Sequence, residues 1–417
     1  MFISYMDHTQ TTFIDLCCGI GGFHQALKNM GMTCVFACDI DKDCRDNYEL
    51  NYNITPEKDI NDIDIPSIPA FDVLCAGFPC QSFSKAGHQK GFDDERGHIF
   101  FRICDIISHH NPKYIILENV KNLSSHDNGN TWITIKQSLQ HLQYNVYDTP
   151  MVLNTLHFGI PQSRERVVII CKRADIGELP PKPIITQKQE TSILSILEKE
   201  YDAKYNISPK LRATRAIWND FLTILRNNKI KIPKFPIWTD WWDSDGVGTT
   251  VTKYNKKLTP EENHLRIQKA QQDFYKKYTN WIDKNRNFYN TYKHLLQPWL
   301  TTSRNNVLWK GAVRKMEWQA DSDQLSMEDV LWSPRGSGVR IKNTNYTPTL
   351  VAMASMIPIY NDRHLTPREC ARLQSFPDDY IIHEKDTVSY KQFGNAVNVY
   401  MIERCARFLI NNEPILI

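Results

Sequence analysis

The sequence lacks the features that would place it in a membrane or in an oxidising compartment. Nothing in its 417 residues approaches the run of about 18 consecutive apolar residues that indicates a membrane-spanning helix. Residues 1–8 have neither the basic start nor the long apolar core of a signal peptide. The 11 cysteines show no Cys-x-x-Cys spacing and no regular pairing pattern. We therefore expect reduced thiols in a cytoplasmic protein.

A metal-ligand pattern is also missing. Cys34, Cys38 and Cys44 lie close together in the sequence, but their spacing fits no usual zinc site. Small buried packing residues are the better interpretation of this cluster. We expect no metal.

Charge is unevenly distributed along the chain, although the net formal charge is only +3. Residues 183–362 contain 27 Lys and Arg against 18 Asp and Glu, whereas the rest of the chain is acidic. Nine of the ten tryptophans lie in the same stretch. A basic, aromatic-rich insert is typical of a segment that faces a polyanion, and the alternative is a basic surface without a specific partner.

Short apolar runs alternate with helical patterns from residue 11 to about residue 172. Strands are predicted at 12–16, 33–37, 71–76, 114–117 and 167–170, and helices at 22–30, 42–52 and 100–109. Continuous apolar strands alternating with helices indicate an α/β fold, with a mostly parallel sheet covered on both faces. The sequence therefore predicts a Rossmann-like domain.

The prolines at 180, 181 and 183 interrupt this pattern and are typical of a linker. In the insert that follows, Thr259-Pro260-Glu261-Glu262 predicts a helix start with a capping box. That helix is expected to run, with a break, towards Leu296 and to end before Pro298. Residues 388–410 are expected to supply a last strand or turn and a closing helix.

Glycines stand between the first predicted strand and the first helix, in Asp15-Leu16-Cys17-Cys18-Gly19-Ile20-Gly21-Gly22. Such a turn lets a ligand approach the backbone and points helix amides towards it. Asp39 ends the second strand, where a Rossmann-like fold places the acid that binds ribose hydroxyls, and Asp59 is positioned to meet an adenine amino group. Because the third glycine of the dinucleotide fingerprint is absent, an adenosyl ligand without a pyrophosphate fits better than NAD.

Three groups suited to catalysis follow predicted strands. Cys80 stands in Gly77-Phe78-Pro79-Cys80-Gln81-Ser82, directly after the third strand, where α/β folds present nucleophiles. Glu118, in Glu118-Asn119-Val120, ends the fourth strand at the same edge of the sheet. Arg164 and Arg166 precede the last strand, and strand alternation places both on one face.

These motifs, in this order, resemble those of the cytosine-C5 DNA methyltransferase family. The resemblance covers the Asp-Leu-x-x-Gly-x-Gly-Gly-Phe, Pro-Cys-Gln, Glu-Asn-Val and Gln-x-Arg-x-Arg motifs, and the closing Gly394-Asn395-Ala396-Val397. A further block, at 365–377, also matches. The family usually has Phe where this chain has Cys17, and often an aromatic residue at Ile40; both changes remove ring stacking worth about 0.5–1.5 kcal/mol.

The resemblance implies S-adenosyl-L-methionine as cofactor, double-stranded DNA as substrate, and an enzyme that acts as a monomer. It implies that Cys80 adds to C6 of a flipped cytosine, that Glu118 acts as the acid at N3, and that Arg166 and, less directly, Arg164 hold the base. The residues expected to bind the cofactor are Asp15, Cys17, Cys18, Gly19, Ile20, Gly22, Asp39, Ile40, Asp59, Ile60, Gly77, Pro79, Asn395, Ala396 and Val397. Those expected to contact DNA are Phe78, Gln81, Ser84, Lys85, Arg335, Arg340 and Thr349.

The expected organisation is a catalytic and cofactor-binding part at 1–174, a target-recognition domain at 175–362, a hinge segment at 363–387 and a returning C-terminal segment at 388–417. The lack of regulatory domains fits a bacterial or viral modification enzyme that protects DNA from restriction. Two alternatives remain open: a tRNA methyltransferase on the same scaffold, disfavoured by the large insert, and a catalytically inactive DNA-binding regulator, disfavoured by the intact Cys80, Glu118, Arg164 and Arg166. A nicotinamide-dependent dehydrogenase is a more distant third.

Overall fold

The computed structural model describes residues 10–79, 98–185, 188–243, 255, 257–320 and 326–415. The chain divides into two compact units, and each is described by itself. Unit 1 consists of Met1–Lys199, Asn345–Ala354 and Thr366–Ile417, and unit 2 of Glu200–Thr344 and Ser355–Leu365. Residues 175–199 and 345–354, which the sequence assigned to the target-recognition domain, thus group with unit 1.

Unit 1 is built on a seven-stranded sheet in the order β2-β1-β3-β4-β8-β5, with β6 pairing to β8. The strands are β1 (Thr12–Leu16), β2 (Thr33–Cys38), β3 (Val73–Ala76), β4 (Tyr114–Val120), β5 (Tyr144–Asn145), β6 (Met151–Asn154) and β8 (Glu165–Arg173). Strands β2, β1, β3 and β4 are parallel, as the continuous apolar runs predicted. Strand β8 differs, because it runs antiparallel to β4.

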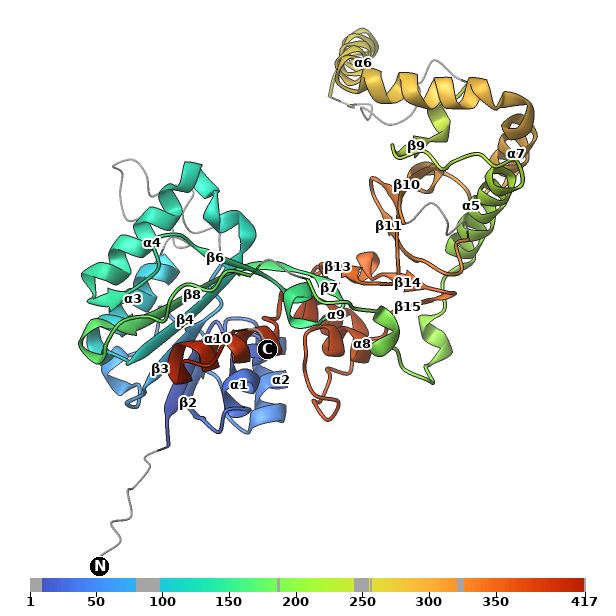
Figure 1. The fold of residues 1–417 in the computed structure, drawn as a ribbon. Helices are drawn as coiled ribbons and strands as arrows, with labels where there is room; N and C mark the ends of the chain where they lie inside the picture. Colours follow the sequence, from blue (N-terminus) through green and yellow to red (C-terminus); the bar gives the residue numbers. More distant parts are fainter. Residues whose placement is uncertain are drawn as a thin grey trace, which may run out of the picture. The chain divides into compact units, whose positions relative to one another are not determined.

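Helices cover both faces of this sheet (Figure 1). On one face, α3 (His98–His110) and α4 (Asn130–His141) pack into an apolar core with Leu74, Ile115 and Ile169. On the other face lie α1 (Gly22–Lys28) and α10 (Val399–Asn411), which contact each other. The C-terminal segment therefore returns to the first helix, next to the glycine turn.

Local capping explains where the flanking helices begin. The Asp41 side chain accepts hydrogen bonds from the N–H groups of Asp43 and Cys44, which starts α2 (Lys42–Tyr52) at the predicted residue. Thr366 and Glu369 form a capping box that starts α8 (Pro367–Leu373). The closing helix expected within 388–410 is α10, and before it the chain forms a further helix, α9 (Asp386–Asn395), where no strand is found.

Unit 2 contains a six-stranded sheet in the order β15-β14-β11-β12-β10-β9. Its strands are β9 (Ile237–Trp238), β10 (Lys315–Gln319), β11 (Leu331–Arg335), β12 (Gly338–Lys342), β14 (Ile359–Tyr360) and β15 (Arg363–His364). Helices α5 (Pro209–Asn227) and α7 (Lys293–Asn305) pack on it through an apolar core. Seven of the nine tryptophans of the basic insert are buried, so most of its aromatic surplus lies in a core.

The capping box at Thr259 starts α6 (Pro260–Thr291), as the sequence predicted. The expected helix end before Pro298 is wrong, because α7 continues through this proline to Asn305. Leu296, Trp299 and Leu300 are buried in the apolar core, and this packing offsets the amide hydrogen bond that proline removes. No helix among the described residues combines the length and the apolar character needed to cross a membrane.

Candidate active site

The end of β3 leads directly into the reacting region. Gly77, Phe78 and Pro79 follow the strand, and the Phe78 ring is buried against Phe100 with a centroid distance of 5.7 Å. The Phe78 carbonyl oxygen accepts a hydrogen bond of 2.8 Å from the side-chain amide of Asn119 at the end of β4. The predicted nucleophile Cys80, together with Gln81, Ser84 and Lys85, lies outside the described residues.

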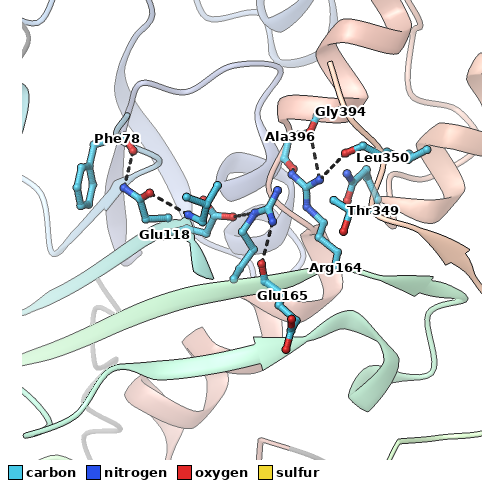
Figure 2. Close-up of polar contacts among 12 residues, drawn as sticks. Phe78, Glu118, Arg164, Glu165, Thr349, Leu350, Gly394 and Ala396 are labelled. Carbon is cyan, nitrogen blue, oxygen red and sulfur yellow. Dashed lines mark hydrogen bonds and ion pairs between the residues drawn. The ribbon is translucent and has the colours of Figure 1, made fainter. Parts of the chain in front are cut away.

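Glu118 and Arg166 form a buried ion pair (Figure 2). The two strands that carry them, β4 and β8, are neighbours in the sheet and run antiparallel. Arg166 Nε lies 2.9 Å from Glu118 Oε1, and the two side chains are only 12% and 10% exposed. The contact is an ion pair without hydrogen-bond alignment, since Oε1 has no aligned donor among the described residues.

The surroundings of Glu118 favour its protonated form. Burial raises the pKa of Glu118 above its ordinary value, and the charges of Arg166 and Arg164 oppose this shift without cancelling it. Arg166 also donates to the Glu165 carbonyl at 2.8 Å, which fixes its guanidinium. A carboxyl group with a raised pKa beside a fixed cation is an arrangement suited to donating a proton.

Arg164 occupies a different position from the one expected of a base-contacting residue. Its side chain is buried and donates to three backbone carbonyls, those of Leu350 (3.2 Å), Gly394 (3.1 Å) and Ala396 (2.8 Å) (Figure 2). Burial and the neighbouring Arg166 lower the pKa of Arg164 to about 9, so the guanidinium stays charged at neutral pH. Arg164 thus joins three segments that are far apart in the sequence.

Two neighbours of Arg164 strengthen the same junction. The Gln162 side chain accepts from the Leu350 N–H at 2.9 Å and donates to the Leu373 carbonyl at 3.0 Å. The Thr349 hydroxyl, which was expected to contact DNA, donates to the Ser163 carbonyl at 2.6 Å. Short strands β7 (Gln162–Ser163) and β13 (Thr347–Pro348) pair alongside these contacts.

Two glycines are required where the C-terminal segment meets its neighbours. A Cβ atom at Gly394 would lie 2.4 Å from the Val351 carbonyl carbon, and one at Gly22 would lie 2.6 Å from a methyl group of Val397. Both distances are far below van der Waals contact, and the neighbour at Gly394 is backbone that cannot move aside cheaply. The predicted return of the closing motif to the glycine turn is therefore a close backbone approach.

The glycine turn and the end of β2 are joined by a carboxylate. Asp39 accepts hydrogen bonds from Gly19 N–H at 2.7 Å and from Asp41 N–H at 2.8 Å. Burial raises the pKa of Asp39, and these two donors oppose the shift. At Gly19, φ is +53° and a Cβ atom would meet nothing within 4 Å, so the backbone there borders open space.

Asp15, at the end of β1, is fully buried. One carboxylate oxygen accepts from the His24 N–H at 3.3 Å, and the other has no hydrogen-bond partner among the described residues. Burial raises the pKa of Asp15 well above its usual range. An unpartnered buried polar atom beside the glycine turn is typical of a ligand site that holds its own donor.

Cys17 and Ile40, the two residues that depart from the family pattern, follow the ends of β1 and β2. Ile40 is 78% exposed, and Arg45 holds its segment by donating to the Asp39 and Ile40 carbonyls. Cys17 is half-buried and has φ of 52°, an uncommon conformation for a cysteine. Asp59 is half-buried and Ile60 buried, both in the segment that precedes β3.

The remaining predicted residues divide between the two units. Cys18, Ile20, Ala396 and Val397 are buried in unit 1, while Asn395 is exposed at the end of α9. Arg335 and Arg340 lie in unit 2, on β11 and β12. Among the parts of the chain that the structure describes, no group of three or more His, Cys, Asp or Glu side chains is arranged to hold a metal ion.

Sequence reasoning missed two functional contacts. Asn119 and Gln162 belong to the motifs, but the sequence assigned them no role. In the structure, the Asn119 amide donates to the Phe78 carbonyl, and the Gln162 amide joins the backbone of Leu350 to that of Leu373. The sequence did contain a signal for these contacts, because Asn119 follows Glu118 directly and Gln162 stands two residues before Arg164. An amide offers both a donor and acceptors, which suits it to bridging backbone groups.

We expect Arg164→Met to destabilise unit 1 by about 3 kcal/mol or more, because three buried carbonyls lose their donor and each costs about 1–3 kcal/mol. Arg173→Met is the matched control. Arg173 ends β8, the strand that begins directly after Arg164. Its side chain pairs with Asp175 and donates to the Asn111 carbonyl at the surface, so the expected loss is below about 1 kcal/mol. Urea denaturation followed by circular dichroism measures both, and equal stability of the two variants would contradict the role of Arg164.

The sequence of the chain matches a known protein family. The model of the C-5 cytosine-specific DNA methylase family matches residues 11–411. The type II methyltransferase M.HhaI of Haemophilus parahaemolyticus is 31% identical over 398 residues, covering 95% of this chain and 94% of the relative. M.HpaII of Haemophilus parainfluenzae is 31% identical over 405 residues, covering 96% and 89%.

Solved structures show the same fold at lower identity. The Dnmt2 methyltransferase of S. pombe has a TM-score of 0.52 at 15% identity, covering 97% of this chain and 99% of that one. A putative DNA modification methyltransferase from a prophage of E. coli has a TM-score of 0.53 at 17% identity, covering 96% and 100%. Since the family model spans nearly the whole chain and the relatives match it from end to end, the chain belongs to the C-5 cytosine-specific DNA methylase family.

Proposed function

We propose that this protein transfers a methyl group from S-adenosyl-L-methionine to C5 of a cytosine in a specific duplex DNA site. The observation that carries the proposal is the buried Glu118–Arg166 pair next to the Phe78 carbonyl, at the end of the strand that leads to Cys80. Family membership supplies the reaction class, and this pair supplies the groups that the reaction needs. The proposed site residues are those predicted from the sequence.

A nucleophile is needed because cytosine C5 attacks an electrophilic methyl group poorly. Addition of the Cys80 thiolate to C6 forms a carbon–sulfur bond and leaves an enamine whose C5 is nucleophilic. After methylation, loss of the C5 proton and release of the thiolate restore the aromatic ring. Since C6 is inaccessible in stacked DNA, the cytosine has to leave the helix first.

Glu118 is proposed as the acid that protonates N3 while the thiolate adds. Its raised pKa keeps the carboxyl protonated to a higher pH than that of an ordinary glutamate. Arg166 is proposed to hold the base O2 and to fix Glu118 from the other side. The Phe78 carbonyl, which accepts from the Asn119 amide, is proposed to accept the exocyclic amine of the cytosine.

Arg164 is proposed as a positioning residue. Its three hydrogen bonds end on backbone carbonyls, so its effect on the base passes through Arg166 and the segments that it joins. Thr349, held on the Ser163 carbonyl, belongs to one of those segments. Its proposed contact with DNA therefore comes from a fixed loop.

The edge formed by the glycine turn fits an adenosyl cofactor. The open space at Gly19 offers a close backbone approach and the exposed Ile40 an apolar surface, while Asp15 lies buried behind the turn. S-adenosyl-L-methionine supplies an electrophilic methyl group on a sulfonium. Asp39 is proposed to hold the ribose hydroxyls, Asp59 and Ile60 the adenine, and residues 395–397 the other side of the site.

The relatives named type II methyltransferases support a role in restriction-modification, in which methylation protects DNA from a cognate nuclease. We propose double-stranded DNA as the partner, read mainly by unit 2, and a monomer that acts in the cytoplasm. The basic surplus of residues 183–362 supports unit 2 as the DNA-facing part.

A covalent-trapping experiment tests the proposed function. Duplex DNA that carries 5-fluorocytosine blocks loss of the C5 substituent, so the wild-type protein and S-adenosyl-L-methionine are expected to give a stable protein–DNA adduct on denaturing gels. Cys80→Ala is expected to give none. Absence of the wild-type adduct, or an undiminished adduct with Cys80→Ala, would contradict the mechanism, and labelled methyl incorporated into tRNA but not into duplex DNA would contradict the substrate.

Glu118→Gln is expected to slow methyl transfer by about 10²–10⁴-fold, because the acid at N3 is lost. Since protonated Glu118 is the active form, the wild-type single-turnover rate is expected to fall as pH rises through its raised pKa. The variant is expected to lack this fall. Glu165→Gln is the matched control, because Glu165 pairs with exposed Lys121, and a similar loss in both variants would contradict the assignment.

Ile40→Trp is expected to tighten binding of S-adenosyl-homocysteine by about 2- to 12-fold, because an aromatic ring restores stacking worth about 0.5–1.5 kcal/mol. Isothermal calorimetry measures this without catalysis. Leu50→Trp is the control, since Leu50 is also exposed in unit 1 but lies on α2. An affinity that rises equally in both variants, or in neither, would contradict the placement of adenine at Ile40.

A further inference from the structure

The two faces of the sheet in unit 2 differ in polarity, because side chains alternate along its strands. Met316, Trp318, Val339, Ile341 and Trp332 alternate along β10, β12 and β11, and all are buried in the core of unit 2. Helices α5 and α7 contribute to the same core (Figure 1). The residues between them therefore point to the opposite side of the sheet.

That opposite face is basic. It carries Lys315, Arg335, Arg340 and Lys342 with one acidic residue, Glu317, and it also carries the buried Leu331 and Ser333 of β11. The pairing register confirms that they share a face, because Glu317 stands next to Arg340 and Arg335 stands opposite Gly338. We name this surface the basic sheet face.

The arginines of the basic sheet face differ in their partners. Arg340 is paired with Glu317, with Nε and one terminal nitrogen both 3.0 Å from Oε2. Arg335 is half-buried, and its Nε has no hydrogen-bond partner within the described parts of the chain. Burial and the adjacent Arg340 lower the pKa of Arg335, and the charge of Glu317 opposes this shift only in part.

Arg335 stands at the tip of a narrow hairpin. Strands β11 and β12 are joined by a turn whose central residues are Gly336 and Ser337, both exposed. At Gly338, φ is +131° and a Cβ atom would lie 2.8 Å from the Lys315 side chain, so the small residue there is required. The hairpin tip thus presents little bulk around the Arg335 guanidinium.

We propose that the β11–β12 hairpin enters the major groove of the target DNA and that Arg335 reads a guanine there. The proposal rests on the DNA-methylating function proposed above. The major groove admits a two-stranded β-ribbon, and an arginine fork donates to both O6 and N7 of guanine. Arg340, held by Glu317, is a positioning neighbour that keeps a second cation beside the first.

A guanine edge suits Arg335 better than a phosphate. Phosphates line the rim of the groove, where exposed and flexible side chains reach them, whereas Arg335 is half-buried beside a slender turn. The two parallel N–H donors of an arginine fork suit a pair of acceptors, which a guanine edge provides.

The test measures discrimination at single positions. Bisulfite sequencing of plasmid DNA methylated by the wild-type protein defines the site, and duplexes are then made with each G·C pair of that site changed in turn. Arg335→Ala is expected to lose about tenfold discrimination at one G·C pair, the range of a bidentate guanine contact. Its binding to unrelated DNA is expected to change by less than about twofold, since non-specific binding depends on phosphate contacts.

Two further variants make the test specific. Arg335→Lys keeps the charge but lacks the fork, so it is expected to behave like Arg335→Ala at that base pair. Arg226→Ala is the control, because Arg226 is exposed on α5, which packs on the apolar side of the sheet. It is expected to leave discrimination unchanged at every position.

The proposal is overturned if Arg335→Ala weakens binding to all duplexes alike and Arg335→Lys restores it, since that pattern indicates a phosphate contact. Unchanged discrimination at every G·C pair overturns it as well. The wild-type protein is the control for the proposed function. If it methylates a defined site, these results concern the role of Arg335 alone. If the wild type methylates no DNA, the proposed function fails and the guanine assignment falls with it.

Discussion

One buried guanidinium, that of Arg164, holds the parts of the candidate site in one arrangement. It donates to carbonyls that stand 186 and 232 residues further along the chain, at Leu350 and Ala396. A planar fork can meet acceptors from several directions at fixed angles, which a lysine cannot. Because Arg164 and Arg166 stand two residues apart, the junction that joins Leu350, Gly394 and Ala396 also fixes the residue paired with Glu118. The free-energy cost of removing this cation from water is offset by the three carbonyl acceptors and by the charge of Glu118.

The sequence predicted the fold well where the signal is local. Strand β1 and helix α2 begin and end at the predicted residues, and the capping box at Thr259 starts α6 where expected. The antiparallel direction of β8 was not predictable, because a buried strand has the same apolar run in either direction. Most of the second sheet escaped prediction for a related reason. Strands such as β9 and β14 have two residues each, and long-range pairing gives them their register. The helix through Pro298 shows tertiary packing overriding a local breaker.

Residue types in the site were easier to predict than their partners. The motifs identified Glu118, Arg166 and Asp39 from the chemistry that the reaction needs. They did not show that the Asn119 amide binds the Phe78 carbonyl, or that Gln162 reaches Leu373 across 211 residues of sequence. Such contacts depend on which strand ends meet in space. Likewise, the need for glycine at position 394 follows from the passage of Val351 beside it, which no local pattern reveals. The assignment of Arg164 to the base illustrates the same limit, since alternation gives its face but not its acceptors.

The positive charge that unit 2 can offer to a partner depends more on ion pairing within the unit than on composition. Residues 183–362 carry nine more basic than acidic side chains, yet many of the arginines are neutralised within the unit. Arg304 pairs with Asp243, Arg314 with Asp240, and Arg215 with Asp362. Such pairs fix loops and contribute little to a field that attracts DNA, because each cation already has its counter-ion. The surplus that remains available to a polyanion is therefore concentrated in the cations without acidic partners. On the sheet of unit 2, Arg335 is such a cation among the described residues, and it ends β11 next to the turn that leads to β12.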